Sequence, residues 1–177
     1  GLACLGASTG YIGKVGNDAF GDFFSNDMKA NGISPIMLKS KTDTGRAIAL
    51  ISPDSERTFA TYLGAAVELN ESDLSADQFK GYQYLHIEGY LVLNHALMNK
   101  AAKLAKENNM KISLDMASYN VVEENIEFLK EYVKNYVDII FANEEEAKAF
   151  TGKEPEKALH EIAEQCEIAI VKIGSKG

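Results

Sequence analysis

The spacing of apolar residues predicts alternating strands and helices along most of the chain. A strand at Tyr11–Val15 precedes a helix that Asp18 caps and Gly32 ends, with apolar residues recurring at the 3.6-residue period of a helix. After Leu69 the alternation becomes regular. We expect strands at Tyr84–Ile87, Lys111–Leu114, Val137–Phe141 and Ile168–Ile173, and helices at 96–107, at 126–136, from Asn143 onward and at 155–166. This order predicts an α/β fold, a parallel sheet with helices on both faces.

One stretch departs from this alternation. Between Ile36 and about Leu63 the pattern changes to short apolar runs with turn residues between them. The runs are Ile36–Leu38, Ala47–Ile51 and Thr58–Leu63, and the turn cluster Ser52–Ser55 joins the last two as a hairpin. We therefore expect a small β excursion, residues 36–66, within one domain.

Composition and charge exclude several classes of protein. The 177 residues fit one domain plus an excursion. A net charge of −8, with only two arginines, disfavours nucleic-acid binding. No apolar run reaches the 18 or so residues that span a bilayer, so no integral membrane protein is expected. Cys4 and Cys166 lie far apart with no ligand spacing around them, which indicates neither a zinc site nor a disulfide framework and favours a reducing, cytoplasmic compartment.

The two ends of the sequence predict a fragment. Leu2–Gly6 is typical of the last turn of a helix closed by glycine, and the chain stops directly after an apolar strand. We expect the given chain to be the central part of a longer domain.

Polar residues and glycine follow the predicted parallel strands. They are Glu88, Asp115, Asn143 and Gly174. Ligands of open α/β sheets bind outside the carboxyl ends of the strands, so this edge is the candidate site. The same residue types are also found in ordinary strand-to-helix turns.

The sharpest local feature is Asn143-Glu144-Glu145-Glu146. It is typical of a capping box, in which Asn143 accepts from a first-turn amide and Glu146 reaches back to the cap's own N–H. The alternative is a phosphate site in which Mg²⁺ or its waters bridge the acidic oxygens. In Val171–Gly177 the glycines allow a close approach of backbone amides to phosphate, although a plain hairpin turn explains them equally. His86 lies within a strand and is expected to be a packed or hydrogen-bonded residue, and no Ser/His/Asp order supports hydrolase chemistry.

Taken together, these motifs resemble the ribokinase-like, PfkB-type family of sugar and nucleoside kinases. Gly16-Asn17-Asp18-Ala19-Phe20-Gly21 is similar to the family's G-x-D-x-x-G helix start. The other similar motifs, in chain order, are Asn31-Gly32-Ile33, Thr44-Gly45-Arg46-Ala47, the N-x-x-E pair Asn143 and Glu146, Phe150-Thr151-Gly152, and the strand and turn at Val171–Gly177. The resemblance covers essentially the whole chain and implies a ribokinase-like, Rossmann-type sheet with the 36–66 excursion as a β lid.

The resemblance also implies roles for single residues. Asn143 and Glu146 would organise Mg²⁺ and the ATP phosphates, with Glu146 toward the metal, and Lys172 and Gly174 would contact ATP. Glu88 would face the hydroxyls of the acceptor, and Asp115 would lie near the phosphates. The family's G-A-G-D motif, with the catalytic base and anion hole, is absent from this chain. We therefore expect no catalytic base before Gly177 and no activity of the chain alone.

The acceptor implied by the resemblance is a nucleoside or a small sugar. Glu56–Ala65 is similar to the lid hairpin of bacterial adenosine kinases, which favours adenosine over ribose or fructose. The resemblance also allows a homodimer through the lid. The alternatives are a non-catalytic nucleotide- or sugar-binding relative and an unrelated Rossmann-like domain, although no G-x-G-x-x-G follows the first strand.

Overall fold

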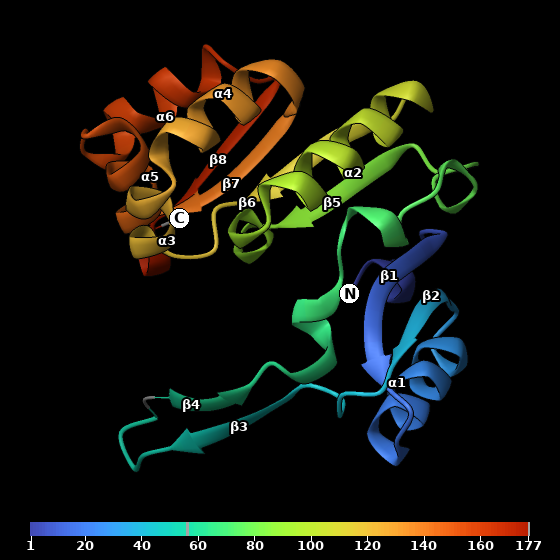
Figure 1. The fold of residues 1–177 in the computed structure, drawn as a ribbon. Coiled ribbons are helices and arrows are strands. Elements are labelled where there is room, and N and C mark those ends of the chain that lie inside the picture. Colours follow the sequence, from blue (N-terminus) through green and yellow to red (C-terminus); the bar gives the residue numbers. More distant parts are fainter. Residues whose placement is uncertain (56, 177) are drawn as a thin grey trace. The chain divides into compact units, whose positions relative to one another are not determined.

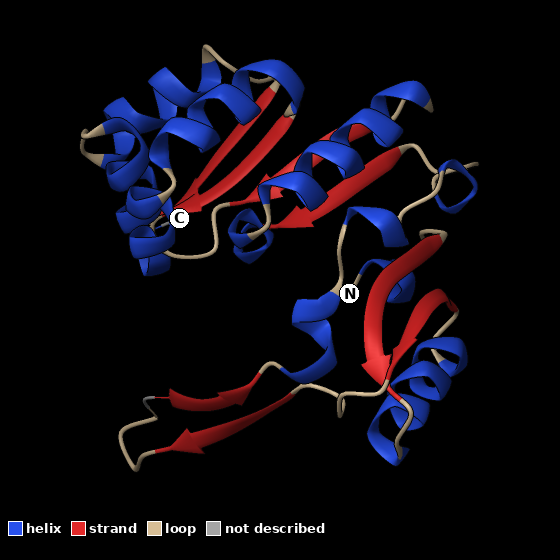
Figure 2. Ribbon diagram, viewed as in Figure 1, coloured by secondary structure: helices blue, strands red, loops and turns tan. Residues whose placement is uncertain are grey.

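A computed structural model describes residues 1–55 and 57–176 of the chain. Glu56 and Gly177, which belong to two of the motifs above, lie outside the described residues. The chain divides into two compact units, Gly1–Leu69 and Asn70–Gly177, each with its own strands and helices (Figures 1 and 2).

The first unit is built on a parallel strand pair. Strands β1 (Thr9–Gly16) and β2 (Ile33–Ser40) pair in parallel from Thr9↔Ile33 to Gly16↔Ser40, and α1 (Ala19–Ala30) connects them. The predicted cap of α1 is confirmed, because the Asp18 side chain accepts from the Gly21 N–H at 2.8 Å. Of the apolar residues expected on one face of α1, Met28 is buried, whereas Phe20 and Phe23 are exposed in this unit.

The hairpin is shorter than the predicted excursion. Strands β3 (Arg46–Ile51) and β4 (Arg57–Tyr62) are antiparallel, with Arg46 opposite Tyr62. The prediction that Ile36–Leu38 belongs to the excursion is wrong, because β2 contains these residues and pairs with β1. A short apolar run has the same residue pattern whether it belongs to a lid or to a sheet, so the pattern alone could not assign these residues to one of them. The 3-10 helix Gly64–Glu68 follows the hairpin.

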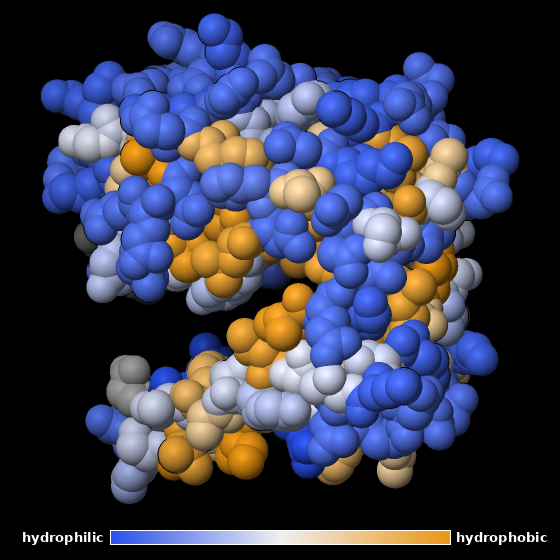
Figure 3. Space-filling model, in the orientation of Figure 1, coloured by the Kyte–Doolittle hydropathy of each residue, from blue (hydrophilic) through white to orange (hydrophobic). Residues whose placement is uncertain are grey.

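Every residue of β3 and β4 is exposed in this unit. The largest exposed apolar side chains of this hairpin are Ile48, Leu50, Ile51 and Phe59, and Figure 3 shows hydrophobic atoms along it. A two-stranded sheet without a core is marginal by itself. The orientation of the hairpin within this unit therefore depends on the contacts at its base, where it joins the rest of the unit.

The second unit holds a four-stranded parallel sheet in the order β5-β6-β7-β8. Its strands are β5 (Tyr84–Glu88), β6 (Lys111–Asp115), β7 (Ile139–Asn143) and β8 (Ile168–Lys172). The helices are α2 (His95–Glu107), α3 (Tyr119–Glu124), α4 (Ile126–Tyr136), α5 (Glu144–Thr151) and α6 (Pro155–Ala163). The predicted strand–helix alternation is confirmed, with boundaries that move by up to three residues; α3 and the short 3-10 helices were not predicted.

The core of this unit lies between the sheet and its connecting helices. Ile87, Leu114 and Ile140 point to this side and are at most 3% exposed, and Leu129 and Val133 of α4 are buried as well. Consecutive strands joined by right-handed crossovers place each crossover helix on the same side of the sheet. Figure 1 accordingly shows α2 and α4 over one face. The predicted α/β fold with a parallel sheet and connecting helices is confirmed, and within the described residues the crossover helices of this unit lie on one face of its sheet.

Candidate functional site

The carboxyl ends of the four parallel strands carry the predicted polar residues on one face. Glu88 lies opposite Asp115, and Asn143 lies opposite Lys172. Side chains alternate along a strand, so these four point away from the buried face that Leu114 and Ile140 occupy. The register thus brings four of the residues predicted from sequence to one edge and one face of the sheet.

An ion pair crosses this edge. The Lys172 Nζ lies 3.2 Å from the Asp115 Oδ2, although β7 separates the two strands that carry them. The other oxygen, Asp115 Oδ1, accepts from the Ala117 N–H at 3.1 Å. Ala117 itself has a φ of 66°, an uncommon conformation for a residue other than glycine. The turn after β6 therefore fixes the Asp115 carboxylate beside Lys172.

Asn143 and Glu146 form the predicted capping box at the start of α5. The Asn143 Oδ1 accepts from the Glu146 N–H at 2.9 Å, and the Glu146 Oε2 accepts from the Asn143 N–H at 2.8 Å. A further bond joins the Asn143 Nδ2 to the Glu146 Oε1 at 2.6 Å. The Glu146 side chain is only 3% exposed, which is unusual for a residue that only caps a helix.

Burial and like charge raise the pKa of two carboxyls at this edge. The pKa of Glu146 is raised by burial and, more weakly, by the charges of Asp115 and Glu88. The pKa of Glu88 is raised by burial and by the charge of Asp115. Lys172 opposes both shifts. Three carboxylates around one ammonium group make a site that favours an additional cation or proton.

The carboxylates fit a magnesium ion that is held mainly through water and phosphate. Among the described residues, no group of three or more His, Cys, Asp or Glu side chains could hold a metal ion by itself. Mg²⁺ is usually bound by one or two carboxylates together with substrate phosphates and retained waters. Each oxygen of Glu146 accepts one hydrogen bond from Asn143 and keeps acceptor capacity for a water molecule.

Gly174 follows β8 on the same edge as Lys172. Its φ of 59° lies in the left-handed region that favours glycine, and a side chain at this position would meet no atom within 4 Å. The residue begins a short 3-10 helix, Gly174–Lys176. The backbone here is therefore open on the side where a side chain would stand.

One contact at this edge agrees with the prediction of a hydrogen-bonded His86, and a second contact, made by Gly89, was not predicted. His86 lies two residues before Glu88 in β5 and is exposed in this unit. Its Nδ1 lies 2.6 Å from the Ser113 Oγ on the same face of the sheet. Gly89 packs against the β6 turn so closely that a Cβ would lie 2.2 Å from the Asp115 carbonyl oxygen. In the sequence, the sign of the Gly89 contact was a glycine directly after the glutamate that ends the strand.

Replacing Lys172 with methionine is expected to raise the pKa of both Glu88 and Glu146 further, because the positive charge that opposes both shifts is lost. Carboxyl carbon chemical shifts followed against pH measure this directly, with Lys148→Met on the surface of α5 as the control. A carboxyl with a raised pKa stabilises the fold below its unfolded pKa, and this contribution is lost as the pH rises through the raised value. Unchanged titration in Lys172→Met would contradict the shared electrostatics of the cluster.

Among the described residues, no helix is both long enough and apolar enough to cross a bilayer.

Comparison with known proteins gives one consistent family. Residues 1–177 match the description "pfkB family carbohydrate kinase". The guanosine-inosine kinase of Escherichia coli (strain K12) is 33% identical over 116 residues, 62% of this chain and 26% of that protein. Probable fructokinase-5 of Arabidopsis thaliana is 27% identical over 98% of this chain and 57% of its own length.

A solved structure shows the same fold at similar identity. The crystal structure of adenosine kinase from Sinorhizobium meliloti is 30% identical, with a TM-score of 0.90 over 99% of this chain and 56% of that chain. The chain thus spans 57% or less of the length of each of these three relatives. Because the family match extends over all 177 residues, the chain belongs to the pfkB family of carbohydrate kinases.

Proposed function

We propose that the protein is an ATP-dependent phosphotransferase that phosphorylates a hydroxyl group of a nucleoside, with adenosine as the first candidate. The observation that carries the proposal is the cluster of Glu88, Asp115, Glu146 and Lys172 at the carboxyl edge of the parallel sheet, where Glu146 begins α5 and the other three end their strands. Membership of the pfkB family supports ATP as the phosphate donor.

The residues divide by their chemistry. Lys172 and the open backbone at Gly174 bind the phosphates of ATP, since an ammonium group and backbone amides both favour anions. Asn143 orients the Glu146 carboxylate, which would hold Mg²⁺ through its bound waters. Mg²⁺ held there would supply positive charge to offset that of the phosphates. Asp115 holds Lys172 near the phosphates, and Glu88 accepts from a hydroxyl of the acceptor.

The acceptor is assigned from the relatives and the hairpin. The matched proteins include a guanosine-inosine kinase and an adenosine kinase, and the Glu56–Ala65 segment is similar to the lid hairpin of bacterial adenosine kinases. A fructokinase-like relative that covers almost the whole chain supports the alternative, a kinase for a free sugar.

An acceptor screen with the intact protein tests the assignment. With ATP and Mg²⁺ we expect ADP release to depend on the acceptor, with adenosine giving a kcat/KM at least about tenfold above those of ribose and fructose. Guanosine and inosine belong in the same screen. A free sugar that matches or exceeds every nucleoside would overturn the nucleoside assignment and leave a sugar kinase. Binding of ATP without turnover of any acceptor would favour the non-catalytic alternative.

Three further expectations stay predictions. They are the lid role of the β3–β4 hairpin, a homodimer through it, and a cytoplasmic location.

A further inference from the structure

We propose that Asp18 is a positioning residue that holds the base of the β3–β4 hairpin, residues 40–45, against the start of α1, and that Glu68 holds the same base from its other side. The inference rests on the proposed kinase function for its effect on the acceptor, because the hairpin is the lid in that function. The contacts themselves lie wholly within the first unit.

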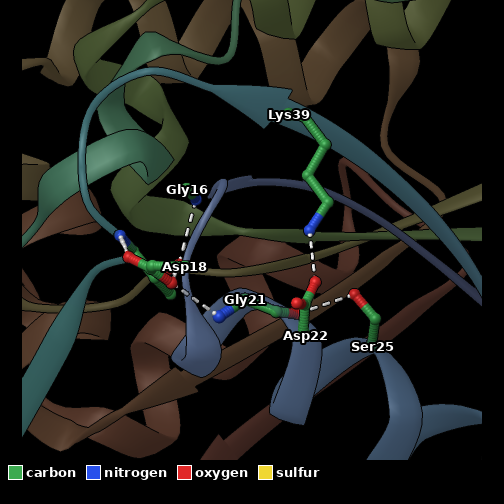
Figure 4. A network of polar contacts seen from close by, with 7 residues as sticks. Gly16, Asp18, Gly21, Asp22, Ser25 and Lys39 are labelled. Carbon is green, nitrogen blue, oxygen red and sulfur yellow. Dashed lines mark hydrogen bonds and ion pairs between the residues drawn. The ribbon is translucent and has the colours of Figure 1, made fainter.

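Asp18 binds the hairpin base with both carboxylate oxygens. Its Oδ2 accepts from the Thr44 N–H at 2.7 Å, and its Oδ1 accepts from the Thr44 hydroxyl at 2.6 Å. The Thr44 Oγ1 in turn accepts from the Gly16 N–H at 2.9 Å, at the end of β1. These bonds hold the pKa of Asp18 well below its usual range, at about 2, so the carboxylate is ionised at neutral pH. Figure 4 shows Asp18 between Gly16 and Gly21 in this network.

The glycines around Asp18 bring the base against the backbone. A Cβ at Gly16 would lie 2.7 Å from the Thr42 carbonyl oxygen and 2.7 Å from the Thr44 nitrogen. A Cβ at Gly21 would lie 2.5 Å from the Gly16 carbonyl oxygen and 3.0 Å from the Thr44 Oγ1. Both positions therefore require glycine if the base is to reach Asp18. A cap of α1 alone would need neither contact.

Glu68 binds the base at its other end. One oxygen of Glu68 accepts from the Ser40 hydroxyl, and the other accepts from the Thr42 hydroxyl. The Ala65 N–H donates to the Asp43 carbonyl oxygen at 2.8 Å, which joins the chain entering the hairpin to the chain leaving it. The base is thus fixed at residues 40, 42 and 44, whereas the two strands beyond it are exposed along their length.

The variant Asp18→Asn distinguishes a clamp, by which we mean the bonds from Asp18 to Thr44, from a simple cap of α1. Asparagine caps helices about as well as aspartate, so the bond to the Gly21 N–H survives. Asp18 Oδ1 accepts from both the Gly21 N–H and the Thr44 hydroxyl, so the asparagine oxygen keeps these two bonds. Its NH₂ group replaces Oδ2 and faces the Thr44 N–H, so that bond is lost. We expect the Thr44 and Ala65 amides of the intact protein to exchange hydrogen at least about tenfold faster, since a charged hydrogen bond is lost.

In the kinase assay the same variant is expected to raise the KM for the acceptor about tenfold and to leave the KM for ATP unchanged. An unclamped hairpin must be ordered when the acceptor binds, which weakens apparent acceptor affinity. Thr44→Ser keeps the hydroxyl and should behave as the unsubstituted protein, whereas Thr44→Val removes the hydroxyl bonds to Asp18 and Gly16 and should also raise the KM for the acceptor. The control is Asp22→Asn, one turn further along α1, which removes only the ion pair with Lys39 at 3.0 Å.

The two readouts distinguish the possible failures. Unchanged exchange at Thr44 and Ala65 in Asp18→Asn, with an active unsubstituted enzyme, overturns the clamp and leaves the kinase function standing. Absence of kinase turnover in the unsubstituted protein overturns the proposed function, and hydrogen exchange alone then decides the clamp. Equal effects of Asp18→Asn and Asp22→Asn would reduce Asp18 to a general stabiliser of α1 and overturn the proposal.

Discussion

Glu146→Gln in the intact protein is expected to lower kcat about 100-fold and to leave the melting temperature nearly unchanged. Residues that orient a metal's surroundings typically account for about 10–100-fold in activity, and Glu146 is the most buried carboxylate of the cluster. Burial disfavours the ionised form of Glu146 and therefore raises its pKa. A neutral glutamine avoids that cost, which offsets the loss of one hydrogen bond to Asn143.

The neighbouring residue provides a matched control. Glu145 lies in the same first turn of α5 and is exposed, so Glu145→Gln changes the same charge near the same helix terminus without touching the capping box. We expect its kcat to stay within about twofold of the unsubstituted enzyme. A fall in melting temperature with full turnover in Glu146→Gln would show that Glu146 only caps the helix.

Where local chemistry determines structure, the sequence was sufficient. Asn143 followed by Glu146 predicted a capping box, and both reciprocal bonds are present. Asp18 predicted the start of α1, and the alternation after Leu69 predicted the four parallel strands. The strand ends then gave Glu88, Asp115, Asn143 and Gly174 as neighbours, since parallel strands present their carboxyl ends at one edge. Lys172 came from the family resemblance alone.

Where structure depends on pairing, the sequence was insufficient. The apolar run Ile36–Leu38 suited either the hairpin or the parallel pair, and only the register with β1 decides between them. The single covered face of the second sheet follows from its strand order, which periodicity does not report. The Asp18–Thr44 contact joins residues 26 positions apart, and it requires the backbone near Thr44 to lie close to Gly16 and Gly21. In the sequence only the spacing of these glycines indicates that contact.

Gly89→Ala is expected to lower the free energy of unfolding by about 3 kcal/mol, in the upper part of the range for overpacked sites, and to reduce kcat/KM about 100-fold. The added Cβ would lie 2.2 Å from the Asp115 carbonyl oxygen and 2.8 Å from the Met116 carbonyl carbon. Both atoms belong to the backbone, so no side-chain rotation relieves the overlap. The end of β5 and the turn after β6 must separate, which moves Asp115 relative to Lys172 and Glu88.

Denaturant unfolding and steady-state kinetics well below the melting temperature separate the two effects. Gly81→Ala is the control, because its Cβ would meet no atom within 4 Å and its φ of 82° alone opposes the change, at a cost of about 1 kcal/mol. We expect Gly81→Ala to keep its kcat/KM. If Gly89→Ala instead loses stability but retains full kcat/KM, the placement of Asp115 by the β5–β6 contact does not matter for catalysis. Asp115 would then stabilise the sheet edge through Lys172 without contributing to the phosphate site.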